Sequence, residues 1–373
     1  MNRFNTSEWA GAFGDIGILI PFVIGYISIQ AFDPLGVLFA FGVFLIISGI
    51  YYKTPFPVQP MKAIGGAAIS QVNFITPNMI FGAGLFTGLF WLVVGLSGTL
   101  KHISKIIQTP IIKGISLGLG FSIIIQGTGL MRDDLLIAAI ALIMTAILLI
   151  NKKIPAMFVL IVFGVSVTII TSPAVLQDIS QVQPNFGLPQ FALGSLTWQE
   201  LLTGIFVLAI PQLPLTFGNA VVAVTAENNR LFPNNPTTEN KTAIFQGIMN
   251  LASPIVGGIP MCHGAGGMAA HVRFGARTGG TTIILGGFLL VLGLFFSNHV
   301  VLFFDMLPLA VLGVVLFFAG VELAMSARGA CQEIQDYYIL IVTAGFSIWN
   351  VGVGFLIGII LQETFKRNIF KID

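Results

Sequence analysis

The chain has 373 residues, of which 55% are hydrophobic and only 9% are charged, and its mean hydropathy is +0.94. Soluble domains carry about 25% charged residues, so this composition excludes a soluble globular protein and predicts an integral membrane protein in contact with the lipid bilayer. The net charge of +2 indicates no nucleic-acid partner, and Cys262 and Cys331 form no CxxC motif, so we expect no disulfide framework, metal site or cofactor.

Hydrophobic segments of bilayer length recur along the whole sequence, and one span needs about 20 apolar residues. We predict long spans at 9–29, 34–52, 78–99, 110–130, 134–150, 154–171, 200–224, 240–258, 279–297, 301–325, 336–351 and 353–369. Two short spans, 60–72 and 264–275, complete a set of fourteen. At about 1.5 Å per residue, each short span covers roughly half of the hydrocarbon. The first residues contain no basic region followed by a cleavage site, so we expect no removable signal peptide.

The positions of lysine and arginine agree with this count. If the N-terminus lies in the cytoplasm and the chain crosses fourteen times, Arg132 falls outside, Lys62 falls within a span, and the rest of the 17 basic residues fall on the cytoplasmic side. Those cytoplasmic residues are Arg3, Lys53, Lys101, Lys105, Lys113, Lys152, Lys153, Arg230, Lys241, Arg273, Arg277, Arg328, Lys366, Arg367 and Lys371. Because positive residues concentrate in cytoplasmic loops, we predict a multi-pass protein of the cytoplasmic membrane with both termini in the cytoplasm.

The predicted spans divide into two halves of seven. Residues 1–171 hold spans 1–7 and residues 200–373 hold spans 8–14. The segment 172–199 between them is rich in Pro, Gln and Ser and contains no Lys or Arg, so we expect it to be an extracytoplasmic linker. Because seven is odd, the halves insert with opposite orientations. The predicted fold is therefore an all-α membrane protein built as a 7+7 inverted repeat.

Both short spans follow interrupted, proline-containing segments. The first reads Pro55-Phe-Pro-Val-Gln-Pro-Met-Lys62 and the second reads Gly257-Gly-Ile-Pro-Met-Cys-His-Gly264. Breaks of this kind are rare in lipid, because each unsatisfied backbone group costs several kcal/mol there. Matching breaks in two inverted halves indicate the substrate site of a transporter at mid-membrane.

A helix that begins at mid-membrane has unpaired N–H groups and the positive end of its dipole at that point, so it favours an anion. In the first half we expect Pro60 at the first helical position, with the neighbouring side chains at the mouth of the helix. In the second half a glycine-rich start lets backbone approach a ligand closely. The predicted site therefore includes Gln59, Pro60, Met61, Lys62, His263, Gly264, Ala265 and Gly266.

Several of these polar residues have two possible roles. Lys62 either binds the anion or extends to the interface and serves only topology, and an ionisable residue inside a span favours the first. His263 either contacts the ligand or is a neutral helix cap. Gln212, Thr216 and Asn219 share one face of span 8 and either line the cavity or join helices by hydrogen bonds.

Three further charged positions have ambiguous roles. Asp15 in span 1 pairs with Lys62, binds a coupling proton or orients a loop, and direct contact with an anion is disfavoured because like charges repel. Arg273 and Arg277, at the end of the second short span, either anchor the cytoplasmic face or belong to a gate. We expect Asp15 to be a coupling or structural residue.

The chain resembles the molybdate transporter family, which is related to sulfate permeases. The matching stretches are Phe13-Gly-Asp-Ile-Gly17, Pro57-Val-Gln-Pro-Met-Lys62, Pro211-Gln-Leu-Pro-Leu-Thr-Phe-Gly-Asn-Ala220, Pro260-Met-Cys-His-Gly-Ala-Gly-Gly267 and Arg273-Phe-Gly-Ala-Arg277. The resemblance implies the fold of uracil and sulfate permeases. In that fold a core domain (spans 1–4 and 8–11) moves against a gate domain (spans 5–7 and 12–14), and substrate lies between the starts of spans 3 and 10. The soluble domain that sulfate permeases append is not expected here.

Together these observations predict a secondary active transporter that imports molybdate, coupled to protons through Asp15 or His263, with a homodimer through the gate domain implied by the fold. Sulfate and tungstate are tetrahedral dianions too, and they remain alternative substrates. A nucleobase permease would need acidic residues where Gln212 and His263 stand, and an anion channel would need a continuous polar pore. No HExxH motif or Ser–His pairing indicates an enzyme.

Overall fold

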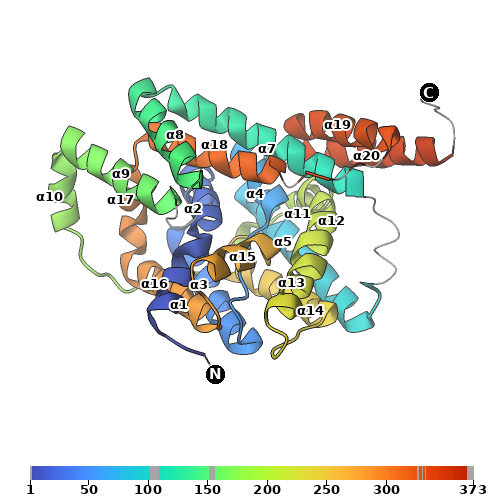
Figure 1. The fold of residues 1–373 in the computed structure, drawn as a ribbon, viewed down its shortest axis with the longest axis horizontal. Helices are drawn as coiled ribbons and strands as arrows, with labels where there is room; N and C mark the ends of the chain where they lie inside the picture. Colours follow the sequence, from blue (N-terminus) through green and yellow to red (C-terminus); the bar gives the residue numbers. More distant parts are fainter. Residues whose placement is uncertain are drawn as a thin grey trace.

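The computed structural model describes residues 2–100, 109–150, 156–325, 327–329, 331 and 333–367, and this part of the chain is almost entirely helical (Figure 1). Within it, 5 helices are long and apolar enough to cross a membrane, or up to 6 if the bent pair Thr6–Asp15 and Leu19–Ile29 is one span. The structure is therefore that of a helical membrane protein, as expected. The count of fourteen spans stays a prediction. Of the basic residues used for the topology, Lys101, Lys105, Lys152, Lys153 and Lys371 lie outside the described residues.

The helices of the first half begin and end at local signals that the sequence contains. Asp33 caps α3 by accepting a hydrogen bond from the amide of Leu35 at 3.1 Å, and Lys53 ends it in the left-handed region. Thr76 caps α5 in the same way, and Gly98 ends it. The elements are α1 (Thr6–Ala12), η1 (Phe13–Asp15), α2 (Ile16–Ile24), η2 (Gly25–Ile29), α3 (Pro34–Tyr52), β1 (Gln59–Pro60), α4 (Lys62–Ser70), α5 (Pro77–Ser97), α7 (Thr109–Met131), α8 (Leu135–Ile150), α9 (Ala156–Thr171) and α10 (Ala174–Ser180).

The second half starts with one continuous helix of 34 residues, Trp198–Leu231, which contains two π-helical stretches. Pro211 and Pro214 lie between these stretches, and as prolines they have no N–H to donate to the regular hydrogen bonds of an α-helix. The elements are η3 (Leu193–Ser195), α11 (Trp198–Gly204), η4 (Ile205–Ala209), α12 (Ile210–Leu215), η5 (Thr216–Ala223), α13 (Val224–Leu231), α14 (Glu239–Ala252), η6 (Ser253–Val256), β2 (Met261–Cys262), α15 (Ala265–Arg273), α16 (Gly280–Phe296), η7 (Ser297–His299), α17 (Val300–Asp305), α18 (Leu309–Met325), α19 (Ile334–Trp349) and α20 (Val351–Lys366).

The predicted continuous span 301–325 is wrong. The helix that begins with α16 runs through η7 into α17, and the break falls at 306–308, after which α18 begins at Leu309. Pro308 explains this position, because proline lacks an N–H and is disfavoured inside a helix but tolerated at its start. Hydropathy alone placed the boundary several residues too early, since residues on both sides are equally apolar.

The segment predicted to link the halves contains the short helices α10 and η3, and between them it runs extended along the second half. The amides of Asn185 and Gly187 donate to the carbonyls of Phe295 and Leu294, both at 2.8 Å. The amide of Ala192 donates to the carbonyl of Ile255 at 3.1 Å. The linker is therefore held against the ends of α16 and η6 by backbone hydrogen bonds.

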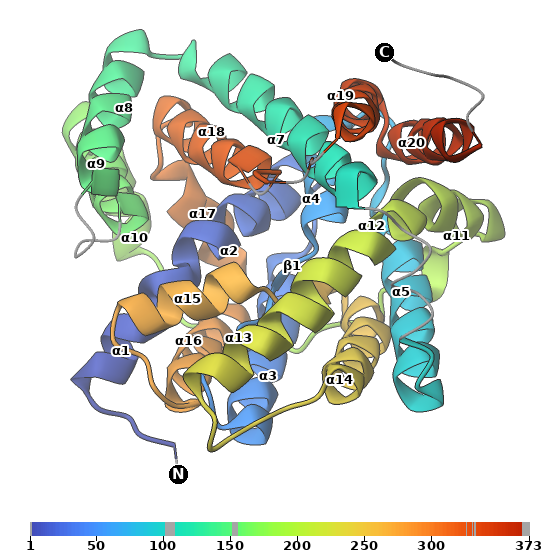
Figure 2. The same ribbon diagram turned by 45° about the vertical axis from the view of Figure 1, so that its right-hand side comes forward.

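Long helices from the two halves pack against each other in pairs. α7 runs beside α18, α3 beside α16 and α5 beside α14, and both views show α7 and α18 side by side (Figures 1 and 2). Glycines face each other across the α7–α18 contact. A Cβ added at Gly120 would lie 2.7 Å from the carbonyl oxygen of Gly320, and one added at Gly320 would lie 2.6 Å from that of Gly120. For Gly127 and Gly313 the distance is 2.6 Å in both directions. Small residues permit this close approach, which drives helix association in lipid.

The two interrupted segments meet near the middle of the molecule, where β1 is labelled in Figure 2. β1 and β2 pair antiparallel, with Gln59 opposite Cys262 and Pro60 opposite Met261. Beside them the amide of Met61 donates to the carbonyl of Pro260 at 3.0 Å. The short helices α4 and α15 therefore start from one shared two-stranded ribbon.

Side chains from neighbouring helices satisfy the remaining backbone groups of this ribbon. The carbonyl of Met261 accepts hydrogen bonds from the side-chain amides of Gln246 and Asn250, both at 2.6 Å, and its amide donates to Asn250 Oδ1 at 2.8 Å. Ser48 and Ser253 donate to the carbonyls of Phe56 and Ile259, both at 2.8 Å. These hydrogen bonds pair backbone groups that the interruption of the helices would otherwise leave unsatisfied.

The glycine contact between α7 and α18 leads to a prediction about stability. Gly127→Val should destabilise the protein by about 1–3 kcal/mol, because the added atoms overlap the backbone of Gly313 and Phe317. Gly129→Val on the same helix is the matched control, since a Cβ there meets no atom within 4 Å. Thermal unfolding of the purified protein in detergent measures both. Equal midpoints for the two variants would show that this contact does not stabilise the fold.

Candidate functional site

The start of α4 is closed by a side chain from the other half of the protein. Gln212 Oε1 accepts hydrogen bonds from the amides of Ala63 and Ile64, at 2.8 and 3.4 Å, and Gln212 Nε2 donates to Thr216 Oγ1 at 2.9 Å. Both Gln212 and Thr216 are buried. Gln212 therefore occupies the place at the α4 N-terminus where an anion was expected.

The start of α15 is open by comparison. Gly264 is its N-cap and no side chain caps the helix. Gly266 in the first turn is exposed, and a Cβ added there would meet no atom within 4 Å. Asn219 Nδ2 lies near this end, 3.4 Å from where a Cβ of Gly264 would stand. Ala265, the first helical residue, is half-buried.

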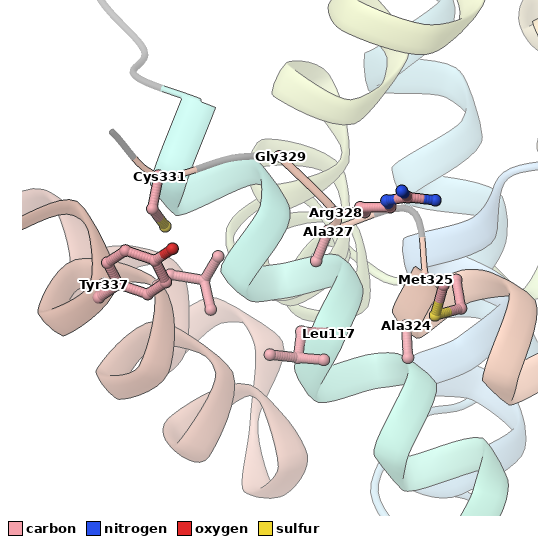
Figure 3. Close-up of a pocket in the computed structure, with 9 residues that line it drawn as sticks. Leu117, Ala324, Met325, Ala327, Arg328, Gly329, Cys331 and Tyr337 are labelled. Carbon is pink, nitrogen blue, oxygen red and sulfur yellow. The ribbon is translucent and has the colours of Figure 1, made fainter. Parts of the chain in front are cut away.

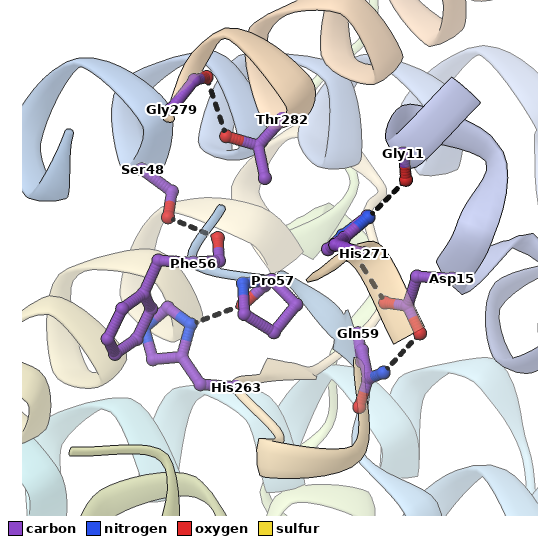
Figure 4. Close-up of polar contacts among 10 residues, drawn as sticks. All are labelled: Gly11, Asp15, Ser48, Phe56, Pro57, Gln59, His263, His271, Gly279 and Thr282. Atoms are coloured by element: carbon purple, nitrogen blue, oxygen red, sulfur yellow. Dashed lines mark hydrogen bonds and ion pairs between the residues drawn. The ribbon is translucent and has the colours of Figure 1, made fainter. Parts of the chain in front are cut away.

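A buried polar cluster lies beside the open end of α15 (Figure 4). Gln59 Nε2 donates to Asp15 Oδ1 at 2.6 Å, and Asp15 Oδ2 is 4.0 Å from His271 Nε2. His271 is fully buried and Asp15 is 2% exposed. Gly267 lies against both Gln59 and Asp15, so no side chain fits at that position. The cluster joins span 1, the ribbon and the second short helix.

The ring of His263 points away from this cluster. Its Nδ1 is 2.7 Å from the carbonyl oxygen of Pro57, and the ring is surrounded by aromatic rings, with centroids at 4.8 Å for Phe56, 5.3 Å for Phe245 and 5.9 Å for Tyr52. Figure 4 shows His263 beside Phe56 and Pro57, with Gln59 directed to Asp15 instead. The backbone of His263 therefore adjoins Gly264 at the open end of α15, whereas its side chain points elsewhere.

The first predicted segment is placed differently from expectation at one residue. Pro60 lies in β1 and not at the first helical position, because the hydrogen bond of Met61 to Pro260 keeps the chain extended until α4 begins at Lys62. Met61 is buried, whereas Lys62 is half-buried at the start of α4. The charge of Lys62 lies close enough to Asp15 and to Lys113 on α7 to interact with both.

Sequence reasoning missed two intramembrane ionisable residues. His271 lies within the short span 264–275, and Glu322 lies within the predicted span 301–325, where its charge interacts with Asp15. The rule that ionisable residues inside spans are functional candidates would have identified both.

Glu8 was missed too, and its role follows from its contacts. This carboxylate is 1% exposed and accepts hydrogen bonds from the amides of Arg277 and Thr278, at 3.1 and 3.3 Å, and from the hydroxyl of Thr281. The Arg277 guanidinium donates to the carbonyls of Val272 and Ala276, at 3.0 and 2.7 Å. Glu8 and Arg277 therefore hold the turn after α15, and the choice between anchoring the cytoplasmic face and a gate role stays a prediction.

A separate cleft of about 320 Å³ lies between α7, the end of α18 and the start of α19 (Figure 3). It is lined by Leu117, Met325, Arg328, Cys331 and Tyr337, among others. None of the predicted site residues lines it, so it is distinct from the ends of the short helices. Among the described residues, no group of three His, Cys, Asp or Glu side chains is placed to hold a metal ion.

The fold matches that of a known anion transporter. Its similarity to the transmembrane domain of a cyanobacterium bicarbonate transporter, BicA, has a TM-score of 0.67 at 15% identity and covers 95% of this chain and 96% of that chain. Together with the apolar helices, this similarity defines the fold of a multi-pass membrane protein.

Sequence comparison specifies the family. The chain is 30% identical to Molybdate transporter 2 of Arabidopsis thaliana, over 97% of this chain and 87% of that protein. It is also 30% identical to Molybdate transporter 1 of the same organism, over 96% of this chain and 88% of that protein. A family model described as "Molybdate transporter of MFS superfamily" matches residues 7–123 and 204–323. The chain belongs to this molybdate transporter family, and the resemblance read from its motifs is confirmed.

The contact of Gln212 with α4 can be tested by substitution. Gln212→Leu should lower stability by about 1–3 kcal/mol, because it leaves the amides of Ala63 and Ile64 buried without an acceptor. Gln199→Leu is the control, since Gln199 is exposed on the same long helix. Thermal unfolding in detergent is the measurement. A midpoint for Gln212→Leu that matches the control would mean that water or another group replaces the cap.

Proposed function

We propose that this protein is a secondary active transporter that imports molybdate across the cytoplasmic membrane, coupled to protons. The observation that carries the proposal is the uncapped, glycine-lined start of α15, which faces open space beside Asn219. The oxyanion binds there, between the starts of the two short helices. The first amides of α15 and its dipole stabilise the negative charge in place of water.

The proposed architecture is the fourteen-span inverted repeat, with a core of spans 1–4 and 8–11 and a gate of spans 5–7 and 12–14. Its support is that helix contacts occur in matching pairs. α3 packs on α16 as α14 packs on α5, α8 packs on α18 as α19 packs on α7, and α8 packs on α9 as α19 packs on α20. Pairs of this kind are expected when two halves are related by a two-fold axis. Homodimerisation through the gate stays a prediction.

The electrostatics near α15 and α4 favour a dianion. Lys62 lies on the core helix α4 and Lys113 on the gate helix α7, and their charges are close enough to interact. α4 packs on α7, so an anion beside Lys62 would lie near the boundary along which the core is proposed to move. An anion bound beside Lys62 offsets the repulsion between the ammonium groups of Lys62 and Lys113, and this links anion binding to closure of the gate over the core.

Import of a dianion requires a coupled cation. Moving one charge against 100 mV costs about 2.3 kcal/mol, and a dianion entering an inside-negative cell meets this cost twice. Asp15 is the proposed coupling residue, since it is buried and its carboxylate lies against Gly267 in the first turn of α15. His263 is a weaker candidate because its ring lies among aromatic side chains.

Binding measurements test the substrate and the role of Lys62 together. Calorimetry of the purified protein at fixed pH and salt should show molybdate binding that sulfate competes with poorly. Lys62→Ala should weaken it about 10- to 100-fold, the loss expected for one charge-assisted contact. Lys241→Ala, an exposed lysine on α14, is the matched control. A preference for sulfate or tungstate would replace molybdate as substrate, and unchanged affinity in Lys62→Ala would remove that residue from the site.

The open end of α15 gives a second test. Gly266→Val should leave thermal unfolding unchanged, because the position has free space, yet weaken molybdate binding about tenfold or more by filling the place of the anion. Gly345→Val on α19 is the control, since it also meets no atom within 4 Å. Calorimetry and thermal unfolding are measured on the same samples. Wild-type affinity in Gly266→Val would place the anion elsewhere.

A further inference from the structure

We propose that Asp15 and His271 form one proton-binding site, and that the proton held between them enters the cell with the oxyanion. This inference rests on the proposed transport function and extends it. It assigns the coupled proton to a histidine that the motif analysis did not single out.

The hydrogen bond of His271 fixes which ring nitrogen carries a proton. Its Nδ1 is 2.8 Å from the carbonyl oxygen of Gly11, which can only accept, so Nδ1 is the donor. In the neutral ring Nε2 is then left with a lone pair. Nε2 is buried and has no hydrogen-bond partner. A fully buried ring nitrogen without a partner is costly, and it needs an explanation.

The group opposite Nε2 is a carboxylate. Asp15 Oδ2 lies 4.0 Å from Nε2, while Asp15 Oδ1 is already engaged by Gln59 at 2.6 Å. With the ring neutral and the acid ionised, two lone-pair atoms face each other. One added proton turns this arrangement into an attractive contact, either as an imidazolium–carboxylate pair or as a carboxylic acid donating to Nε2. The separation is longer than a hydrogen bond, so the pair would draw together on proton binding.

The same elements carry the proton site and the open anion site. His271 lies on α15, two turns from Gly264 at the start of that helix. Gln59 donates to Asp15, and its other amide atom, Oε1, lies against Gly264 and has no hydrogen-bond partner. Gln59 thus connects the two sites through one side chain. A movement that carries α15, the ribbon and η1 together would carry proton and anion together.

The charges that face the pair come from several elements. Glu8 on α1 acts on His271, and Lys62 on α4 and Glu322 on α18 act on Asp15. α13 also packs on α15, but its charged residues, Glu227 and Arg230, pair with each other at 2.7 Å. Arg273 follows His271 on α15 itself. Asp15 is thus a buried carboxylate that lies against both His271 and Gly267 in the first turn of α15.

The sign of the coupling follows from charge. An ionised Asp15 repels a dianion at the start of α15, and a proton on the pair removes that repulsion. By reciprocity the anion increases the proton affinity of the pair by the same factor. Molybdate binding should therefore tighten as pH falls through the range in which the pair titrates, by at most about tenfold per pH unit for one proton.

Calorimetry in buffers of different ionisation enthalpy counts the protons taken up on binding. Wild-type protein titrated with molybdate near neutral pH should take up a net amount approaching about one proton per anion. His271→Gln, which keeps a donor for Gly11, and Asp15→Asn, which keeps an acceptor for Gln59, should each reduce this number to near zero and flatten the pH dependence. His299→Gln, on η7 outside the cluster, is the matched control and should retain the wild-type value.

Each outcome decides between the proposals. Molybdate binding without proton uptake in the wild type overturns the proton site but leaves the proposed transport standing. Absence of any oxyanion binding overturns both. Proton uptake that persists in His271→Gln and Asp15→Asn, or that is lost in His263→Gln while His271→Gln retains it, assigns the proton to another group and overturns this inference. Two independent variants keep the test valid if one of them fails to fold.

Discussion

The structure depends on how a membrane protein satisfies backbone groups where a span is interrupted. β1 and β2 meet this constraint by pairing with each other, and Gln246, Asn250, Ser48 and Ser253 satisfy the neighbouring carbonyls and amides. The pairing has a geometric consequence. Because Gln59 lies opposite Cys262, α4 and α15 start side by side. Two helix N-termini therefore lie together inside the protein, which two continuous spans would not provide. The solution to a backbone problem thus creates the candidate anion site.

The two short helices are used differently although they start from the same ribbon. α4 is surrounded by apolar residues, and Gln212 closes its first turn. α15 begins with glycine, has no side-chain cap and exposes Gly266. In the proposed mechanism α4 supplies the charge of Lys62 and a rigid wall, while α15 supplies the open amides. Because α4 is capped and α15 is not, the two similar interrupted segments need not bind two anions.

Charge balance connects the anion site with the rest of the core. A dianion beside Asp15 is unfavourable unless a proton accompanies it, and His271 is the basic group placed against that carboxylate. His263, which the motifs made prominent, is enclosed by Phe56, Phe245 and Tyr52 and contacts Pro57. It therefore packs between the ribbon, α3 and α14. In the proposed mechanism, coupling requires only that α15 and η1 move as one unit.

The sequence by itself determined the features that depend on local chemistry. Helical spans followed from hydrophobic length. The starts of α3 and α5 depend on the capping and proline residues Asp33-Pro34 and Thr76-Pro77, and the short helices follow from the proline and glycine residues that interrupt the segments before them. The break at Pro308 was missed because hydropathy does not register a single absent N–H. Only the tertiary structure decided that Gln212 caps α4, that Pro60 stays in a strand, and that His271 faces Asp15 while His263 does not. The direction of a side chain depends on what packs around it, and those neighbours come from segments that are distant in the sequence.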